Sequence, residues 1–191
     1  MLSFPFESLA ASATSIFEFA SRSLVFRMGE RSSGFYHVLE GEVHLHRITR
    51  NGDAVVIHRA FSGDYFAEAS LFSETYHCDA IATKPTRLVK IDRQTTLQLM
   101  RGNARFSQDL ASYLAGRVQS YRSLLELRSI RSAEERVLAA VTDGWLEGSV
   151  VSFASQIGLT QEATYRALSA LVRKGRLSKS GRGQYEPADK V

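Results

Sequence analysis

The residue types best suited to chemistry lie between positions 152 and 175, in the segment SFASQIGLTQEATYRALSALVRKG. One side of a predicted helix there carries four polar side chains, namely Gln161, Glu162, Tyr165 and Arg166. In a DNA major groove, Gln matches the edge of adenine, Glu that of cytosine and Arg that of guanine. Tyr165 could contact a thymine methyl group or a phosphate. The pattern therefore predicts that this helix contacts bases in duplex DNA.

Two elements must position that row of side chains. A first helix carries an apolar stripe from Phe153 to Ile157, and Gly158 ends it. Thr160 can then cap the second helix, whose other side is apolar. This is a helix–turn–helix pattern, although an ordinary helical hairpin would show the same periodicity. Ser152 and Thr160 are further candidates for DNA contacts.

A basic segment follows the second helix, with no acidic residue between positions 163 and 185. Arg173, Lys179 and Arg182 are its candidates for holding DNA phosphates, an attraction that does not depend on base sequence. Residues 175–187 predict a short β-hairpin with its turn at Ser180 and Gly181. The three parts together predict a winged helix–turn–helix.

Composition limits the remaining possibilities. A chain of 191 residues can form two small domains. The net charge of +4 and the pI near 9.4 fit an anionic partner, either nucleic acid or a membrane surface. No apolar run reaches the roughly 18 residues of a spanning helix, and the first residues make a poor signal peptide. The single cysteine cannot form an internal disulfide, so we expect a cytoplasmic protein.

The first half of the chain shows short strands between glycine turns, in residues 23–30, 34–48, 54–66 and 85–91. A turn at Asn51 and Gly52 predicts that His44 pairs with Arg59, with Val43 and Leu45 facing inward. Residues 66–75 predict one or two helical turns. The expected class is α+β, with an N-terminal β-roll, or jelly-roll-like, sensor.

A long helix is predicted over residues 104–127, after a short helix that Asp92 caps. Its apolar residues repeat at spacings of three and four: Phe106, Leu110, Leu114, Val118, Tyr121 and Leu125. Such a seam packs against a second copy in a homodimer, against its own β-roll, or against each in part. Ser132 opens the next helix, so we expect domains at 1–92, 93–131 and 132–191.

This order of elements resembles the CRP/FNR family of bacterial transcription regulators. The similarity covers nearly the whole chain and is most specific in residues 26–30, 36–43, 63–72 and 158–168. The resemblance implies a long dimerisation helix, an effector held in the roll, and base readers at Glu162 and Arg166. Gln161 stands where the cyclic-AMP member has a basic residue, and Tyr165 where a small residue is usual. A TGTGA-like half-site is therefore only partly expected.

The same comparison predicts an atypical effector pocket. In the family's cyclic-nucleotide cassette a glutamate holds the ribose, and an Arg-Ser pair holds the phosphate. This chain keeps Glu68, has Ala67 for a glycine, and has Cys78 and Asp79 for the Arg-Ser pair. Asp79 would repel an anionic phosphate, so ordinary cyclic AMP is not the expected effector. The candidate effector residues are Phe66, Glu68, Cys78, Asp79, Tyr121 and Arg122, of which Arg122 could rescue anion binding.

Other sensor chemistries remain open. His77 beside Cys78 could bind a metal or form a redox-sensitive thiol, and haem is a further alternative. His44 and His46 share one face of a strand, as metal ligands can, or are simply exposed. Cys78 would otherwise be a small buried core residue. The cofactor is left unknown.

These observations predict a homodimeric transcription regulator on a palindromic DNA site, controlled by an effector other than ordinary cyclic AMP. The alternatives are a cyclic-nucleotide-responsive regulator or a sensor of metal, thiol redox state or haem. A further alternative is a small-molecule or metal-binding sensor whose winged head contacts protein. The expected partners are double-stranded DNA, a second copy, RNA polymerase and an unidentified effector, without a membrane. The histidine pattern of a cupin-type metal enzyme is missing, so no enzyme activity is expected.

Overall fold

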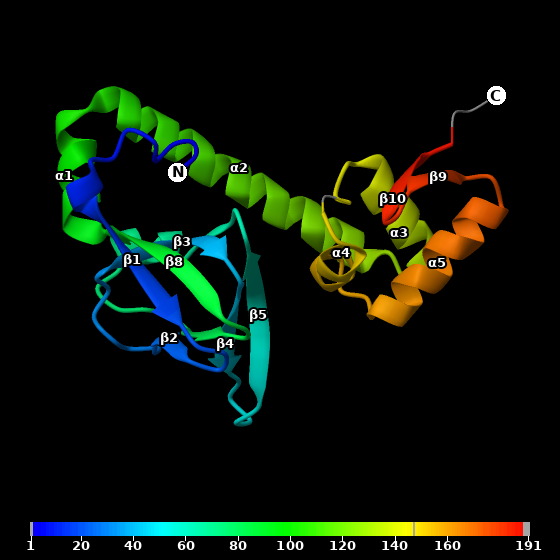
Figure 1. Ribbon diagram of the computed structural model, residues 1–191, viewed down its shortest axis with the longest axis horizontal. Coiled ribbons are helices and arrows are strands. Elements are labelled where there is room, and N and C mark those ends of the chain that lie inside the picture. The colour runs from blue at the N-terminus through cyan, green and yellow to red at the C-terminus, as the bar shows by residue number, and fades with distance from the viewer. Residues whose placement is uncertain (1, 147, 189–191) are drawn as a thin grey trace. The chain divides into compact units, whose positions relative to one another are not determined.

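The computed structural model describes residues 2–146 and 148–188, and the chain divides into two compact units, Met1–Leu114 and Ala115–Val191 (Figure 1). The first unit contains two four-stranded antiparallel sheets. One has the order β1 (Thr14–Phe19), β8 (Thr86–Asp92), β3 (Gly34–Glu40), β6 (Tyr65–Phe66). The other has the order β2 (Leu24–Phe26), β7 (Asp79–Ala82), β4 (Glu42–Ile48), β5 (Ala54–Phe61). Two short 3₁₀ segments, η1 (Ala11–Ala13) and η2 (Glu68–Phe72), complete this part.

The two sheets enclose an apolar core because alternate strand residues point between them. Val38, Val43 and Leu88 are fully buried there, and Leu45 is 7% exposed. The inward orientation predicted for Val43 and Leu45 is therefore confirmed, and so is the α+β class with an N-terminal roll. Gly41 makes the tight connection from β3 to β4 possible. Its φ of 105° is unfavourable for other residues, and a Cβ there would lie 2.3 Å from an oxygen of Thr86.

Two helices cover the other face of the first sheet. Asp92 caps α1 (Arg93–Gly102) by accepting a 2.8 Å hydrogen bond from the Thr95 amide, as predicted. The long helix α2 (Ala104–Ser129) follows. Its first turns place Phe106 and Leu110 in a second core cluster of this unit. This part of the predicted seam thus packs on the chain's own roll.

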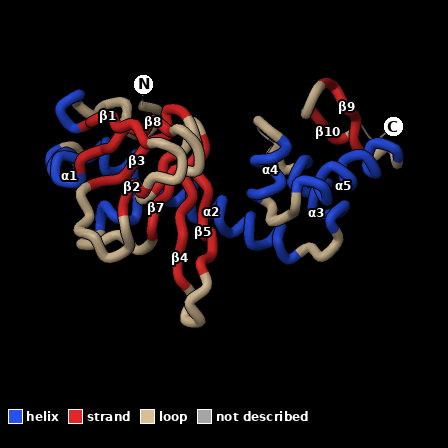
Figure 2. Tube along the Cα trace, turned by 60° about the horizontal axis from the view of Figure 1, so that its bottom comes forward, coloured by secondary structure: helices blue, strands red, loops and turns tan. Residues whose placement is uncertain are grey.

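The β4–β5 hairpin agrees with the prediction near its base and departs from it toward its tip. His44 pairs with Arg59, as expected. The register then shifts by one residue after Leu45, and residues 49–53 form a five-residue loop in place of a two-residue turn. The strands β1 and β7 were not predicted. Figure 2 shows this hairpin extending beyond the rest of the roll.

Besides the C-terminal part of α2, the described residues of the second unit form three helices and a hairpin. They are α3 (Ala133–Thr142), α4 (Val150–Gln156), α5 (Gln161–Arg173), β9 (Leu177–Gly181) and β10 (Gln184–Pro187). The wing is thus a β-hairpin, as predicted. Its turn lies at Arg182 and Gly183, so the prediction of Ser180 and Gly181 was wrong. No helix among the described residues is long and apolar enough to cross a membrane.

The part of α2 in the second unit leaves apolar side chains in solvent. The exposed fractions are 49% for Val118, 46% for Tyr121 and 69% for Leu125. The seam therefore changes character along one helix, buried at its start and open further on. The division between units falls within α2, at Leu114 and Ala115, whereas the boundaries at 92/93 and 131/132 remain predictions.

Candidate nucleic-acid interface and effector site

The start of α5 is fixed by local hydrogen bonds. Gly158 turns the chain with a φ of 71°, and α4 has ended just before it. Thr160 then caps α5, its Oγ1 accepting a 3.1 Å hydrogen bond from the Ala163 amide. One of the amides at the start of α5 that lack a helical partner is thereby satisfied, and the side chains that follow have a defined direction.

Packing decides which face of α5 is presented to solvent. Ala167, Leu168 and Leu171 are at most 3% exposed and join the core cluster of the second unit with Phe153. The opposite face carries the predicted base readers, all of which are exposed: Gln161, Glu162, Tyr165 and Arg166. The structure thus brings these four side chains to one surface.

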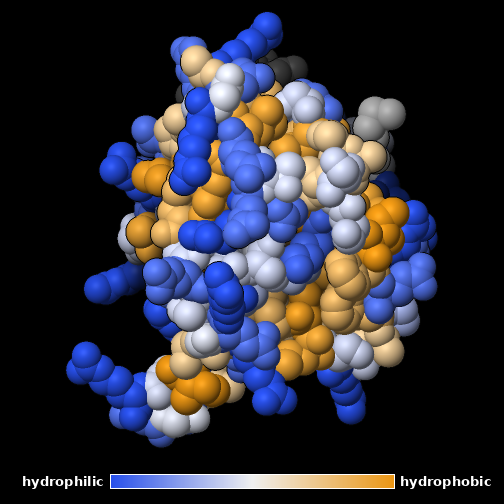
Figure 3. Space-filling view, turned by 90° about the vertical axis from the view of Figure 1, so that its left-hand side faces the viewer, coloured by the Kyte–Doolittle hydropathy of each residue, from blue (hydrophilic) through white to orange (hydrophobic). Residues whose placement is uncertain are grey.

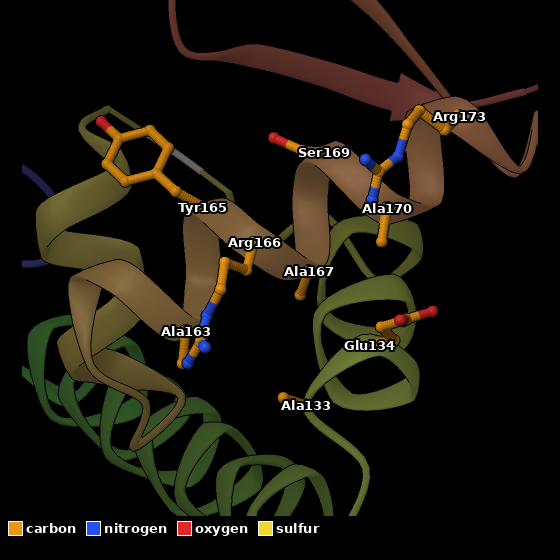
Figure 4. Close-up of a pocket in the computed structure, with 9 residues that line it drawn as sticks. All are labelled: Ala133, Glu134, Ala163, Tyr165, Arg166, Ala167, Ser169, Ala170 and Arg173. Carbon is orange, nitrogen blue, oxygen red and sulfur yellow. The ribbon is translucent and has the colours of Figure 1, made fainter.

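A groove of about 580 Å³ runs between α5 and the first turn of α3. Figure 4 shows Arg166 turned toward this groove, while Tyr165 and Ser169 point away from it. Glu134 faces the groove from α3 and also pairs with Lys174, with a nitrogen–oxygen distance of 2.5 Å. The exposed face of α5 therefore has two parts of different shape, one hollow and one raised.

The basic residues from the end of α5 onward fall into two groups. Lys174 and Arg176 are neutralised by Glu134 and Glu135 of α3. The residues predicted to hold phosphates, Arg173, Lys179 and Arg182, are exposed and form no ion pair within the described part of the chain. Lys179 lies 5.9 Å from the ring centre of Tyr185. The candidate phosphate contacts are thus the positive charges left available.

The Ser152 hydroxyl does not cap α4. The start of α4 is capped by Ser149, whose oxygen accepts a 3.1 Å bond from the Ser152 amide, and the Ser152 side chain itself is half-buried. A contact from Ser152 to DNA stays a prediction. The Ser149 cap was missed, although a serine before an apolar turn is its usual signal.

Two arginines with no recognisable signal in the sequence hold the turn between α4 and α5. Arg128 donates to the carbonyl of Gln156 at 3.2 Å. Arg136 donates to Ile157 and Gly158 at 3.3 and 3.4 Å, and its Nε donates to Ile130 at 2.9 Å. These guanidinium groups satisfy carbonyls at the end of α4 that lack helical partners. Only the three-dimensional structure brings the donors to these carbonyls.

In the roll, the predicted metal pair does not converge. Cys78 is 8% exposed in the core between the sheets, whereas His77 is exposed. Burial raises the pKa of the Cys78 thiol, which disfavours the thiolate that a metal or an oxidant requires. Within the described residues, no three His, Cys, Asp or Glu side chains are grouped as metal ligands.

The polar groups of the predicted effector set already have partners in the chain. The Glu68 carboxylate accepts a 2.9 Å hydrogen bond from the Tyr113 hydroxyl of α2. Asp79 accepts a 2.7 Å bond from the Met28 amide. Phe66 is fully buried in the core. These partners were not foreseen, because they lie 45 and 51 positions away in sequence.

Tyr121 and Arg122 belong to the second unit, where both are exposed. Arg117 donates a 3.1 Å hydrogen bond to the Tyr121 hydroxyl, and its guanidinium lies 5.3 Å from the ring centre. A role for Tyr121 and Arg122 in effector binding stays a prediction.

Comparison with known proteins agrees with this arrangement. The family described as the cyclic nucleotide-binding domain matches residues 16–103. The "Cyclic AMP receptor protein" of Thermus thermophilus is 28% identical over 159 residues, which cover 79% of this chain and 74% of the relative. The chain belongs to the CRP/FNR family. "Transcriptional regulator SdrP" of the same organism is 27% identical, with 81% of this chain and 79% of the relative covered.

Solved structures of the CRP/FNR family share the fold. FixK2 from Bradyrhizobium japonicum has a TM-score of 0.65 at 22% identity, covering 92% of this chain and 93% of that one. The catabolite activator protein of Thermus thermophilus has a TM-score of 0.53 at 26% identity, covering 95% and 92%. The named relatives are transcription regulators rather than enzymes, in agreement with the expectation for this chain.

Proposed function

We propose that this CRP/FNR-family chain is a homodimeric regulator that binds a palindromic DNA site and responds to an effector other than ordinary cyclic AMP. This proposal rests on the exposed row of side chains at the start of α5, from Gln161 to Arg166. Thr160 caps this helix, and the core behind the helix orients it. A helix of this kind enters the major groove with its first residues toward the base edges.

The chemistry of the side chains divides the expected DNA contacts between base edges and phosphates. Arg166 can donate two parallel hydrogen bonds to guanine, and each such pair contributes about 1–3 kcal/mol of discrimination. Arg173, Lys179 and Arg182 would contact phosphates, which position the protein without selecting sequence. These three charges remain available to DNA, because the acidic residues of α3 pair with Lys174 and Arg176 instead.

The proposed dimer rests on the exposed end of the α2 seam. Val118, Tyr121 and Leu125 lie at spacings of three and four and have nearly half or more of their surface in solvent. A second copy of the same helix could cover them through a two-fold contact. Two heads related in this way would match two half-sites of a palindrome.

The effector proposal rests on the residues at the phosphate-binding positions. The resemblance places an Arg-Ser pair there, and this chain has Cys78, which is buried, and Asp79, which already accepts from a backbone amide. Neither supplies the positive charge that a cyclic phosphate needs. We place the protein in the cytoplasm, with RNA polymerase as a further partner, because the named relatives regulate transcription.

A binding-site selection from random duplexes, followed by titration of the selected site, tests the DNA proposal. Arg166→Ala should lose about 1–3 kcal/mol at one base pair of each half-site and accept other bases there. Lys179→Ala should weaken all duplexes alike and reduce the slope of log affinity against log salt by about 0.9 per phosphate contact. A selected sequence unchanged by Arg166→Ala would show that Arg166 does not read bases.

The oligomeric state is a separate measurement. Leu125→Asp puts a charge into the proposed seam and should convert a dimer to a monomer in sedimentation equilibrium. Ser123→Asp, at an exposed position two residues away, is the matched control and should leave the dimer intact. A monomeric wild-type protein at micromolar concentration would refute the dimer without deciding whether the head binds DNA.

A further inference from the structure

A groove of about 250 Å³ opens between the edge strands β1 and β2 of the roll. It lies in the first unit, outside the DNA-reading head, and Phe66, Glu68, Cys78 and Asp79 are not among the residues that line it. Figure 3 shows the side of the molecule on which β1 lies in Figure 1, where apolar patches are open to solvent among charged side chains. The geometry points to a binding site in this groove for a small, single-ring aromatic carboxylate.

The floor of the groove consists of stacked aromatic rings. The ring centres of Phe26 and Tyr76 are 3.8 Å apart at an interplanar angle of 12°. Tyr36 also stacks on Phe26, with ring centres 5.6 Å apart at 25°. Above this buried stack, Phe17 leaves 43% of its surface in solvent, and Phe19 is partly buried. A flat apolar ligand can therefore extend a ring stack that the chain has already built.

The rim of the groove is positively charged. Lys90 lies on the same face of β8 as the fully buried Leu88, and in the sheet it pairs with Tyr36. Lys90 lines the groove, and a lysine at such an inward position keeps its charged end toward water. Lys90 and Arg31 form no ion pair within the described part of the chain. These two cations therefore offer an anion a site without displacing an acid.

The other polar groups in the groove are already engaged. The Tyr76 hydroxyl donates to the Gly34 carbonyl at 2.9 Å. The Glu30 carboxylate accepts a 3.1 Å bond from the Arg27 amide. With Glu30 counted against Lys90 and Arg31, the rim has one net positive charge, which suits a monoanion better than a phosphate dianion.

The volume of the groove limits how many rings the ligand can have. Sites for drug-sized ligands span about 300–1,000 Å³, so a groove of this volume holds one ring and its carboxylate. The proposal concerns binding to the roll and stands independently of whether the head recognises DNA.

Calorimetric titration of the full-length protein with benzoate, in the absence of DNA, tests the proposal. We expect one benzoate per chain with a dissociation constant on the order of 1 mM or below. Benzamide keeps the ring without the charge, and cyclohexanecarboxylate keeps the charge without the aromatic ring. Each should bind at least about fivefold more weakly, because each lacks one of the two interactions.

Variants then locate the site. Lys90→Met keeps the aliphatic stem and should weaken benzoate about tenfold. Lys84→Met, which removes another lysine of the same unit outside the groove, should not change benzoate affinity. Phe17→Leu alters an exposed ring, leaves the buried stack in place, and should weaken benzoate about threefold. Phe17→Leu also decides the question if Lys90→Met does not fold.

Three results would overturn the inference. They are no benzoate binding by the wild-type protein at about 10 mM, equal losses in Lys90→Met and Lys84→Met, and full affinity in Phe17→Leu. Binding of cyclohexanecarboxylate as tight as that of benzoate would equally refute the aromatic part of the proposal.

Discussion

Replacing Arg136 by methionine should destabilise the DNA-reading head from a position outside its reading surface. The Arg136 guanidinium donates to Ile130 through two nitrogens, at 2.9 and 2.5 Å, and to Ile157 and Gly158 at 3.3 and 3.4 Å. It therefore holds together the segment before α3 and the turn before α5. Methionine preserves much of the aliphatic stem and removes every donor.

The magnitude follows from these distances. A hydrogen bond from a charged donor contributes about 1.5–3 kcal/mol net. The two bonds to Ile130 share one acceptor and count as one strong interaction, while the two longer bonds contribute less. Arg136 is half-buried, so water recovers part of the loss in the variant. We expect the free energy of unfolding of the second unit to fall by about 2–3 kcal/mol.

Urea unfolding followed by tryptophan fluorescence measures this change. Trp145 is the single tryptophan of the chain, and it packs partly buried against the core of the second unit. Arg131→Met is the matched control, because Arg131 is exposed and makes no side-chain hydrogen bond within the described part of the chain. A loss below about 0.5 kcal/mol, or an equal loss in both variants, would refute the bracing role.

Three further predictions concern other parts of the chain. Thr160→Ala should lower the free energy of unfolding of the second unit by about 1 kcal/mol in chemical denaturation, and Thr160→Ser should restore it, because only serine keeps the cap. Gly41→Ala should cost well over 2 kcal/mol in thermal unfolding, because its methyl group would lie 2.6 Å from the Thr86 Cα. Gly63→Ala, with φ of 96° and open space, should cost about 1 kcal/mol, and equal shifts in the two would show that the contact is unimportant. Cys78 should react with a disulfide reagent far more slowly in the folded protein than in urea, because burial raises the pKa of its thiol. Equal labelling rates at pH 8 would refute this. The stability that the protonated thiol contributes is present at neutral pH and is lost as alkaline pH passes the pKa of the folded state.

Local signals predicted most of the fold. Glycine turns and alternating apolar residues located β3, β4 and β5, and cap residues located the starts of α1, α3 and α5. The strand β1 was not predicted because four of its six residues are exposed, which removes the alternation of a half-buried strand. The four-residue β7 was not predicted for another reason. Its pairing with β2 and β4 is long-range, and a segment so short has little pattern of its own.

The candidate sites show the same difference between features with a local sequence signal and features that depend on long-range contacts. The row on α5 was predictable because helical periodicity alone separates its exposed side chains from Leu168 and Leu171. The turn of the wing was misplaced because Gly181 and Gly183 both allow a turn, and only Gly183 has a positive φ, of 77°. The hydrogen-bond partners of Glu68 and Asp79 depend on tertiary contacts, for which one sequence holds no local signal.

The hydrogen bond between Glu68 and Tyr113 links the predicted effector residue to the long helix. A carboxylate has two oxygens and accepts several hydrogen bonds, so a ligand hydroxyl at Glu68 would either share the carboxylate with the Tyr113 hydroxyl or displace it. Displacement would exchange one hydrogen bond for another, with little net affinity, and would release the tyrosine. Tyr113 belongs to α2 and packs partly buried on the cluster that holds this helix to the roll. An effector that displaces Tyr113 would thus loosen the hold of the roll on the long helix.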